Sequence, residues 1–188
     1  MNERKRAALI TGSGRNIGRA AALALAGMGM NITLNGSKNR EACEIVAKEA
    51  EALGVNAIVA MGDVGSTSDI ETIVKSANEA FGGVDVLVNN AAVRPTSPFL
   101  ETDEDEWERI LNIDFHSSRR LSKAVLPHMI KQGWGRIINF AGMNAIHGYN
   151  GRAPVSVSKH ASWGLTKSLA KEFGGKGLSH PNRLEAYG

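Results

Sequence analysis

Three glycines near the N-terminus have the spacing of a phosphate-binding turn. Gly12, Gly14 and Gly18 follow a short apolar run, residues 7–10, and precede a stretch with apolar residues at helical spacing. A strand that turns through glycines into a helix presents free backbone N–H groups and the positive helix end to an anion. A side chain there would hold a pyrophosphate away from the backbone. The stretch predicts a dinucleotide-binding turn, and a plain strand-to-helix connection is the alternative.

The next predicted strand, residues 31–35, does not end on an acidic residue. Dinucleotide folds that prefer NAD hold the ribose 2′-hydroxyl with a carboxylate about 20 residues after the glycine turn. Gly36 stands at that place, and Arg15, Ser37 and Lys38 are nearby. A carboxylate would repel a 2′-phosphate, whereas these residues would attract it. We therefore expect NADP(H) as the preferred cofactor and NAD(H) as the alternative; solvated loop residues are the plainer interpretation.

Apolar strands and amphipathic helices alternate along the chain and would position these residues. The predicted strands cover residues 7–10, 31–35, 55–61, 84–88 and 135–140. After the helix that follows the glycine turn, predicted helices cover residues 40–53, 67–81, 103–132 and 154–173, with a kink at Pro127. This order predicts an α/β fold, a doubly wound, Rossmann-like parallel sheet in a single domain. Ligands bind such sheets at the carboxyl ends of the strands.

Composition narrows the classes of partner. The chain has 188 residues, of which 43% are hydrophobic and 22% charged, as expected for one soluble globular domain. Its net charge of +3 is scattered, so nothing indicates nucleic-acid binding. No apolar run is long enough to cross a membrane, and no signal peptide is recognisable. Cys43 is the only cysteine, which fits a reducing, cytoplasmic setting. No metal-ligand spacing occurs, so we expect a small-molecule substrate and no metal.

The stretch Thr11–Gly18, TGSGRNIG, resembles the T-G-x-x-x-G-x-G cofactor fingerprint of the short-chain dehydrogenase/reductase family. Asn16 replaces the middle glycine, and Asn is the residue that best tolerates positive φ after glycine. The run Asn89–Ala92 after the fourth predicted strand resembles the family's N-N-A-G. The resemblance, to members of the 3-oxoacyl-carrier-protein reductase type, covers roughly residues 5–176.

The resemblance implies a set of cofactor-binding residues. In the family an Asp-Val pair brackets the adenine ring, and NADP-using members often carry a basic residue at the Arg15 position. A helix N-cap is the alternative role for Asp63, and the amides of Asn89 and Asn90 need hydrogen-bond partners if they are buried. The implied residues are Gly12, Gly14, Arg15, Asn16, Ile17, Gly18, Ser37, Lys38, Asp63, Val64, Asn89, Asn90, Ala91 and Lys159.

The resemblance also implies a catalytic set of Asn, Ser, Tyr and Lys, of which one member is retained. Lys159 matches the lysine of the family's Y-x-x-x-K motif, but Val155 stands at the tyrosine position. Gly142 stands at the serine position and Asp114 at the asparagine position. Hydride transfer to a carbonyl builds an alkoxide that needs a positioned acid. Valine and glycine side chains cannot supply one.

Substitute groups lie in the loop after the fifth predicted strand, which lines the substrate site in the family. Tyr149 would supply a phenol, His147 an imidazole that titrates near neutral pH, and Asn144 a hydrogen-bond donor. With Lys159 and Asp114, we expect Tyr149 and Asn144 to form the catalytic set. A packing role for Tyr149 and a solvated or capping role for His147 are the alternatives.

The last residues do not resemble the family. We expect a dinucleotide-binding domain over residues 1–177 and an atypical tail over residues 178–188. The family's last strands and substrate-covering segment are expected to be missing, which would expose one edge of the sheet. Family members commonly associate through two long helices, here residues 103–132 and 154–173. The resemblance therefore implies a homo-oligomer, a dimer before a tetramer.

The leading hypothesis is an NADP(H)-dependent oxidoreductase that acts on a small carbonyl or alcohol through non-standard residues. One alternative is a catalytically silent nucleotide-binding or oligomerisation protein, which the replaced catalytic positions favour. Another is a non-redox lyase or isomerase on the same scaffold. The retained glycine turn and Lys159 favour a working site.

Overall fold

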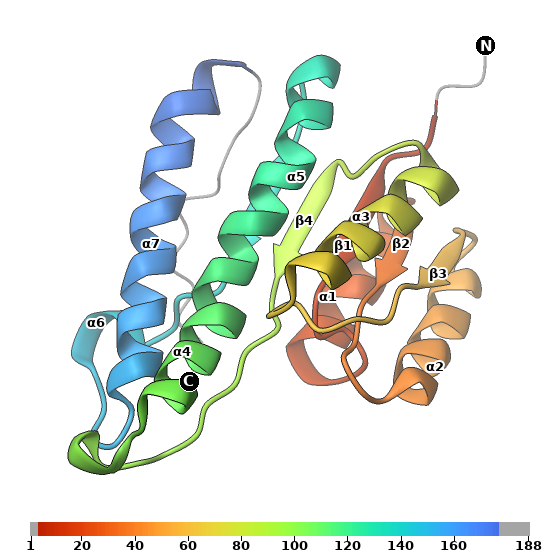
Figure 1. Cartoon of the computed structure of the whole chain (residues 1–188). Coiled ribbons are helices and arrows are strands. Elements are labelled where there is room, and N and C mark those ends of the chain that lie inside the picture. Colours follow the sequence, from red (N-terminus) through yellow and green to blue (C-terminus); the bar gives the residue numbers. More distant parts are fainter. Residues whose placement is uncertain (1–3, 177–188) are drawn as a thin grey trace.

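The computed structural model describes residues 4–176, and its strands form one parallel sheet (Figure 1). The strand order is β3-β2-β1-β4-β5, which confirms the doubly wound α/β fold. The order reverses between β1 and β4, where such sheets form their ligand crevice. The strands are β1 (Ala7–Ile10), β2 (Asn31–Leu34), β3 (Ala57–Val59), β4 (Val86–Asn89) and β5 (Arg136–Asn139).

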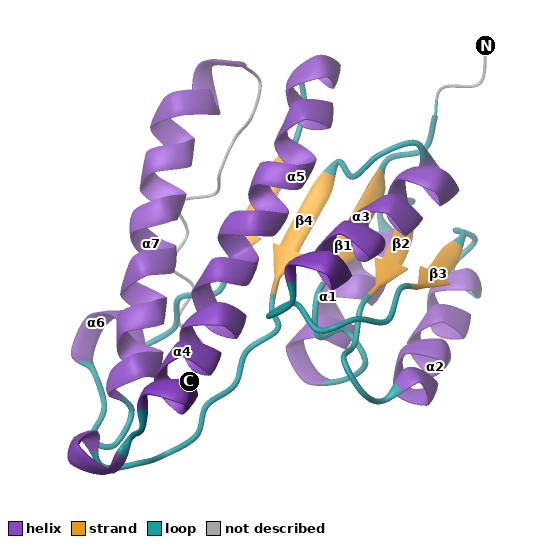
Figure 2. Cartoon of the chain, in the orientation of Figure 1, coloured by secondary structure: helices purple, strands orange, loops and turns teal. Residues whose placement is uncertain are grey.

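Helices connect the strands and cover both faces of the sheet (Figure 2). Within the described residues, none of them is long and apolar enough to span a membrane. The α-helices are α1 (Asn16–Gly27), α2 (Arg40–Glu51), α3 (Thr67–Phe81), α4 (Glu104–Leu111), α5 (Ser117–Gln132), α6 (Asn144–His147) and α7 (Ala153–Phe173). Short 3-10 turns precede α4, at Phe99–Glu101, and follow α7, at Gly174–Lys176.

The central strand β1 divides its side chains between two cores. Ala8 and Ile10 pack with α1 and α2 on one face, whereas Leu9 packs with α3 and α5 on the other. This alternation follows from the two-residue period of a strand. Leu169 and Phe173 of α7 extend the second core, so α3, α5 and α7 share a face. Burial on both faces explains why β1 is apolar throughout.

The helix predicted over residues 103–132 is helical throughout from Glu104, but it contains a π-helical segment that the sequence did not predict. A π-helical segment, Asn112–His116, separates α4 from α5, whereas α5 continues through Pro127. A π-turn widens the helix by one residue and often occurs at functional sites. Here it carries Asp114, whose side chain is buried. Regular helical periodicity cannot reveal such an insertion.

Other boundaries also differ from the predictions. Strand β3 covers Ala57–Val59 only, where it pairs with β2, and is shorter than the predicted strand over residues 55–61. The loop after β5 contains the short helix α6, where an irregular loop was expected. Strand β5 lies at the edge of the described sheet and is partly exposed. The tail, residues 178–188, lies outside the described residues.

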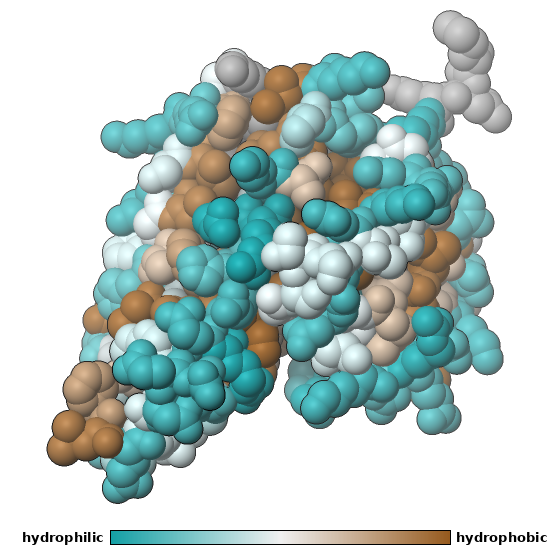
Figure 3. Space-filling model, in the orientation of Figure 1, coloured by the Kyte–Doolittle hydropathy of each residue, from teal (hydrophilic) through white to brown (hydrophobic). Residues whose placement is uncertain are grey.

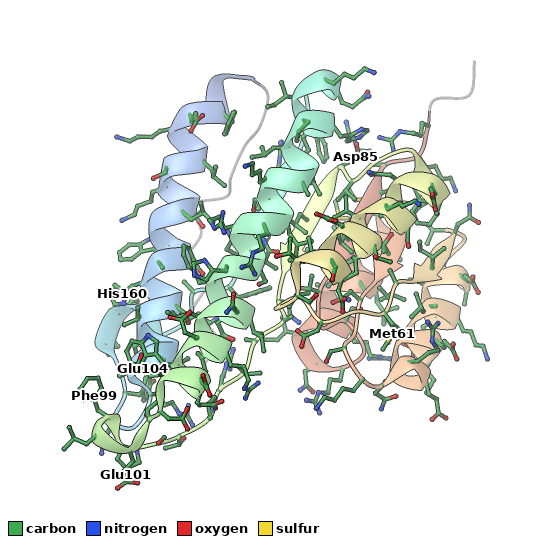
Figure 4. All side chains as sticks on the ribbon, viewed as in Figure 1. Met61, Asp85, Phe99, Glu101, Glu104 and His160 are labelled. Carbon is green, nitrogen blue, oxygen red and sulfur yellow. The ribbon has the colours of Figure 1, made fainter. Side chains whose placement is uncertain are left out.

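The amino and carboxyl ends of the parallel strands, called here the amino edge and the carboxyl edge of the sheet, hold different polar groups. Asp85 precedes β4 and Met61 follows β3, so they mark the amino and carboxyl edges in Figure 4. The buried Asp85 carboxylate accepts hydrogen bonds from Arg4 Nη2 at 2.7 and 2.9 Å and from Ala7 N at 2.8 Å. At this end of the strands the buried carboxylate is therefore already neutralised by Arg4. The carboxyl edge holds the polar residues that the sequence singled out.

Candidate cofactor and catalytic site

The glycine turn after β1 has the backbone conformation that a phosphate cradle requires. Gly12 has φ of 62°, and a Cβ there would lie 3.1 Å from the Cα of Ala91. Asn16 has φ of 49°, as expected for the residue that replaces the family's middle glycine. A Cβ on Gly18 would collide with the carbonyl oxygen of Gly12. No side chain caps α1, whose first amides have no helical acceptor.

Two polar side chains fix this turn against the end of β4. Thr11 Oγ1 accepts hydrogen bonds from the backbone N–H groups of Asn90 and Ala91, each at 3.0 Å. The Asn90 side chain donates to the carbonyl oxygens of Thr11 and Gly12, also at 3.0 Å. Asn90 thus positions the cradle rather than serving only as a ligand contact. The buried Asn35 similarly donates to the carbonyls of Ala60 and Gly62 at 3.0 and 3.1 Å, which ties the end of β2 to the segment after β3.

A cavity of about 930 Å³ lies at this carboxyl edge. The space-filling view in Figure 3 shows the surface hollowed there. Most of the residues predicted to bind a cofactor line it together, namely Gly12, Gly14, Arg15, Asn16, Ile17, Ser37, Lys38, Asp63, Val64, Asn90 and Ala91. The sequence reasoning missed Asn35, Arg94, Arg109 and Ile113, which also line it. Their only sequence signal is proximity to strand ends or to the long helix.

One end of the cavity carries unpaired positive charge. Arg15 and Lys38 are exposed there and form no ion pair within residues 4–176. Beneath them Gly36 is packed so closely that a Cβ would lie 2.8 Å from Cys43 Sγ. Burial raises the pKa of the Cys43 thiol, although a hydrogen bond from Ser13 opposes the shift. An acidic side chain at position 36 would therefore have to displace that sulfur.

Asp63 lies in the cavity wall and is not the cap of the following helix. Its Oδ1 accepts a hydrogen bond from Gly65 N at 2.8 Å, while Ser66 is the N-cap of α3. The N-cap alternative for Asp63 is therefore excluded. Val64 beside it is buried and packs in the core under α3.

Asn89 is directed away from the cavity. Its side-chain amide donates to Asn139 Oδ1 at 2.8 Å, and Asn139 in turn donates to Thr166 Oγ1 at 2.9 Å. This chain of amides links β4, β5 and α7. Asn89 and Gly18 do not line the cavity, although both were expected to bind the cofactor. Their observed contacts are structural.

Lys159 and Asp114 form a buried ion pair between α7 and the π-helical segment. Lys159 Nζ lies 3.5 Å from Asp114 Oδ2, and the side chains are 7% and 0% exposed. The second carboxylate oxygen accepts from Val93 N at 2.7 Å. Burial raises the pKa of Asp114 and lowers the pKa of Lys159, and each partner's charge opposes the shift of the other. Neither side chain lines the cavity, and the Asp114 carboxylate has no surface that a substrate can touch.

The expected substitute groups do not line the cavity and form no hydrogen bond with this pair within residues 4–176. Tyr149 is 50% exposed and Asn144 begins α6, and neither lines the cavity. The Asn144 Nδ2 atom is buried and has no hydrogen-bond partner in residues 4–176. His147 is exposed at the end of α6. Val155 is buried at 1% exposure.

Comparison with known proteins decides the family. A family model described as short chain dehydrogenase matches residues 6–180. The chain belongs to the short-chain dehydrogenase family. This membership accounts for the glycine turn, the Asn-Asn-Ala run and the five parallel strands in the observed order.

Several curated proteins and solved structures are similar to most of this chain. A 3-oxoacyl-[acyl-carrier-protein] reductase from Synechocystis sp. is 34% identical over 172 residues, which are 92% of this chain and 70% of the relative. The reductase FabG of Staphylococcus aureus is 32% identical over 174 residues, 93% of this chain and 71% of the relative. The acetoin dehydrogenase YohF from Salmonella typhimurium has a TM-score of 0.89 and 31% identity, covering 93% of this chain and 69% of that structure.

The cavity of this short-chain dehydrogenase fits a nicotinamide dinucleotide. The side-chain-free cradle at Gly12, the uncapped start of α1 and the cations Arg15 and Lys38 are complementary to phosphate groups. The volume is within the range of cofactor sites in proteins. No cluster of three or more His, Cys, Asp or Glu that would hold a metal ion occurs in the described part of the chain.

Proposed function

We propose that this chain is an NADP(H)-dependent oxidoreductase that acts on a small carbonyl or alcohol. The cavity at the carboxyl edge of the sheet carries this proposal, because it collects eleven of the predicted cofactor residues from four separate loops. The dinucleotide, when bound, supplies or accepts a hydride. Its phosphates would lie against the glycine turn and the start of α1. A cytoplasmic setting accords with the single buried cysteine.

The preference for NADP(H) is supported by the charges at the ribose end of the cavity. Arg15, Ser37 and Lys38 line it, and the place of an NAD-selective carboxylate is held by Gly36. A 2′-phosphate would find two cations and a hydroxyl there. A plain 2′-hydroxyl would leave the cations without a partner.

Titration with NADPH and NADH, followed by nicotinamide fluorescence and melting temperature, tests the proposal. A ligand that binds only the native state raises the melting temperature as it saturates the site. We expect NADPH to bind more tightly than NADH. Lys38→Ala should weaken NADPH binding by about tenfold, the usual cost of one charged hydrogen bond, and leave NADH nearly unchanged. Lys48→Ala, an exposed lysine on α2 that does not line the cavity, is the matched control.

Failure of both nucleotides to bind would overturn the proposal. Equal affinity of the two, with no effect of Lys38→Ala, would leave a dinucleotide site but reject the preference for NADP(H). The two parts of the proposal are therefore separable.

The proposed catalytic residues are Lys159, Tyr149, Asn144 and Asp114. Lys159 is the retained family residue, and Asp114 would position it through the buried ion pair. Tyr149 is half-exposed and does not line the cavity, and in this proposal its phenol supplies the proton to the substrate oxygen. Oxidation of NADPH with a panel of small carbonyl compounds tests this role. An unchanged rate in Tyr149→Phe would remove Tyr149 from the set.

Catalytic silence is the second candidate, and one observation favours it. Val155, at the tyrosine position, is buried and has no proton to give. NADPH binding with no oxidation by any carbonyl in the panel would favour this candidate over a reductase.

A homo-oligomer formed through α5 and α7 is also proposed. The two helices enclose a shallow groove of about 360 Å³ on their outer side. Figure 3 shows hydrophobic surface along the same two helices. The groove is lined partly by Leu126, Pro127, Ile130, Leu165, Leu169 and Phe173.

A further inference from the structure

The backbone of the loop after β4 is anchored by hydrogen bonds at Val93 and at Ser97. At its start, Val93 N donates to Asp114 Oδ1 at 2.7 Å. At its end, Ser97 N donates to the carbonyl oxygen of Gly151 at 2.9 Å. Arg152 Nε donates to Thr96 Oγ1 at 3.2 Å. We call the contacts of Gly151 and Arg152 with this loop the clamp. These contacts restrain the backbone of the residues between Val93 and Ser97.

Arg94 lies between these anchors and presents a free guanidinium to the cavity. Its side chain lines the cavity, is exposed, and forms no hydrogen bond or ion pair within residues 4–176. Pro95 follows it and restricts the backbone at position 94 to extended conformations. The other arginine on this wall, Arg109, is already paired with Glu106 at 2.8 Å. Of these two arginines, Arg94 is therefore the one whose charge is not paired by a carboxylate within residues 4–176.

Arg94 is adjacent in the chain to a residue that contacts the buried pair of Asp114 and Lys159. Its neighbour Val93 contacts Asp114, which pairs with Lys159. The Arg94 charge lowers the pKa of Asp114 and of Lys159, although burial is the larger influence on both, so the guanidinium lies within electrostatic reach of the pair. Arg94 at the cavity wall and the buried pair of Lys159 and Asp114, two cations and one carboxylate, together carry a net positive charge.

We propose that Arg94 binds an anionic group, a carboxylate or a phosphate, on the substrate of this chain. The inference rests on the proposed oxidoreductase function and names the class of its substrate, a small oxo or hydroxy compound that carries a negative charge. A guanidinium presents paired N–H donors that match both groups in a bidentate arrangement. A neutral substrate would not gain this charged contact, so the site would favour an anionic one.

Binding of two matched pairs of probes tests this inference. Acetoacetate and dihydroxyacetone phosphate carry the anionic group, and methyl acetoacetate and dihydroxyacetone are their neutral counterparts. Each is titrated calorimetrically into the full chain saturated with NADP+ and into the chain without nucleotide, at fixed ionic strength. We expect at least one anionic probe to bind more tightly than its neutral counterpart. Comparison of the two pairs shows whether the carboxylate or the phosphate is preferred.

Substitutions then assign the effect to Arg94. Arg94→Gln should weaken binding of the anionic probe by about 10- to 100-fold, the cost of a lost charged hydrogen bond. Arg94→Lys should recover part of the affinity, since it keeps the charge but loses the planar fork. Arg109→Gln removes the same charge from the same wall and should change probe affinity less than about twofold, because Arg109 is already paired.

Three results would overturn the inference. The first is equal binding of anionic and neutral probes. The second is equal loss of probe affinity in Arg94→Gln and Arg109→Gln, which would indicate a diffuse charge effect. The third is weaker NADP+ binding in Arg94→Gln with unchanged probe binding, which would assign the guanidinium to the cofactor phosphates. If the wild-type chain binds no nucleotide, the proposed function fails, and the titrations without nucleotide still decide whether Arg94 binds anions.

Discussion

At the scale of single residues, the ion pair of Asp114 and Lys159 depends on the presence of both partners. The side chains are 0% and 7% exposed, so each charge is separated from water by protein. Removal of one partner leaves an uncompensated buried charge, whereas removal of both can be nearly neutral. Asp114 also stands where the family resemblance implies an asparagine. The coupling energy between Asp114 and Lys159 measures how strongly the two charges depend on each other.

Asp114→Asn should lower the free energy of unfolding by about 3 kcal/mol, because Lys159 would stay buried without a counter-charge. Lys159→Met should also destabilise the chain. The double variant Asp114→Asn/Lys159→Met should be more stable than the sum of the two losses predicts. Urea unfolding of the four proteins measures the coupling as a double-mutant cycle.

The pair of Arg19 and Glu49 is the matched control for this cycle. It is also in direct contact, at 2.8 Å, but both side chains are solvent-accessible. Its coupling should be much smaller because water screens exposed charges. Strictly additive losses at Asp114 and Lys159 would show that their proximity carries no energetic coupling.

At the scale of elements, the loop after β4 is clamped by the turn that precedes α7. Gly151 has φ of 66°, and a Cβ there would lie 3.0 Å from Thr96 Cγ2. Gly151→Ala should therefore lower the free energy of unfolding by about 1–2 kcal/mol through backbone strain, with crowding against Thr96 in addition. Urea unfolding at one protein concentration measures the change. The loop that carries Arg94 would be displaced by the same substitution.

Gly164→Ala, within α7, is expected to raise the free energy of unfolding instead of lowering it. Gly164 lies inside the helix, and a Cβ there would meet no atom within 4 Å. Alanine should raise stability by up to about 1 kcal/mol, because glycine is the poorer helix former. If Gly151→Ala is as stable as wild type while Gly164→Ala behaves as expected, the clamp is not under the strain that its geometry indicates.

At the scale of the whole molecule, the groove between α5 and α7 leaves apolar side chains in water. Ile130 is 38% exposed at its edge, so a substitution there should perturb the folded monomer little. We expect a dimer at micromolar concentration, and Ile130→Glu should raise its dissociation constant by more than about tenfold, because a charge would be buried at the interface. Light scattering combined with size-exclusion chromatography measures the mass of each protein.

Ile45→Glu is the control for this substitution. Ile45 lies on α2, is 53% exposed and does not line the groove. It should leave the dimer intact. A wild-type protein that is monomeric at micromolar concentration would reject the proposed oligomer outright.

The sequence by itself determined those features that depend on local sterics and periodicity. The apolar run at residues 7–10 and the helix at 67–81 have their predicted bounds, because strand and helix periods are set within a few residues. Asn16 has the positive φ expected of it, since that preference belongs to the residue itself. The order of strands and helices was enough to predict the doubly wound sheet, because crossover connections are right-handed.

Only the tertiary structure decided which distant side chains meet. Asp114 and Lys159 are 45 positions apart, and their pairing depends on the π-helical segment that no periodicity predicted. Asn89 was expected at the cofactor, but its amide is directed to β5. The only sequence signal for Arg94 was its place after a strand, and its loop is held by contacts from Gly151 and Arg152. Such outcomes are set by packing and desolvation between segments far apart in the chain, which local sequence does not encode.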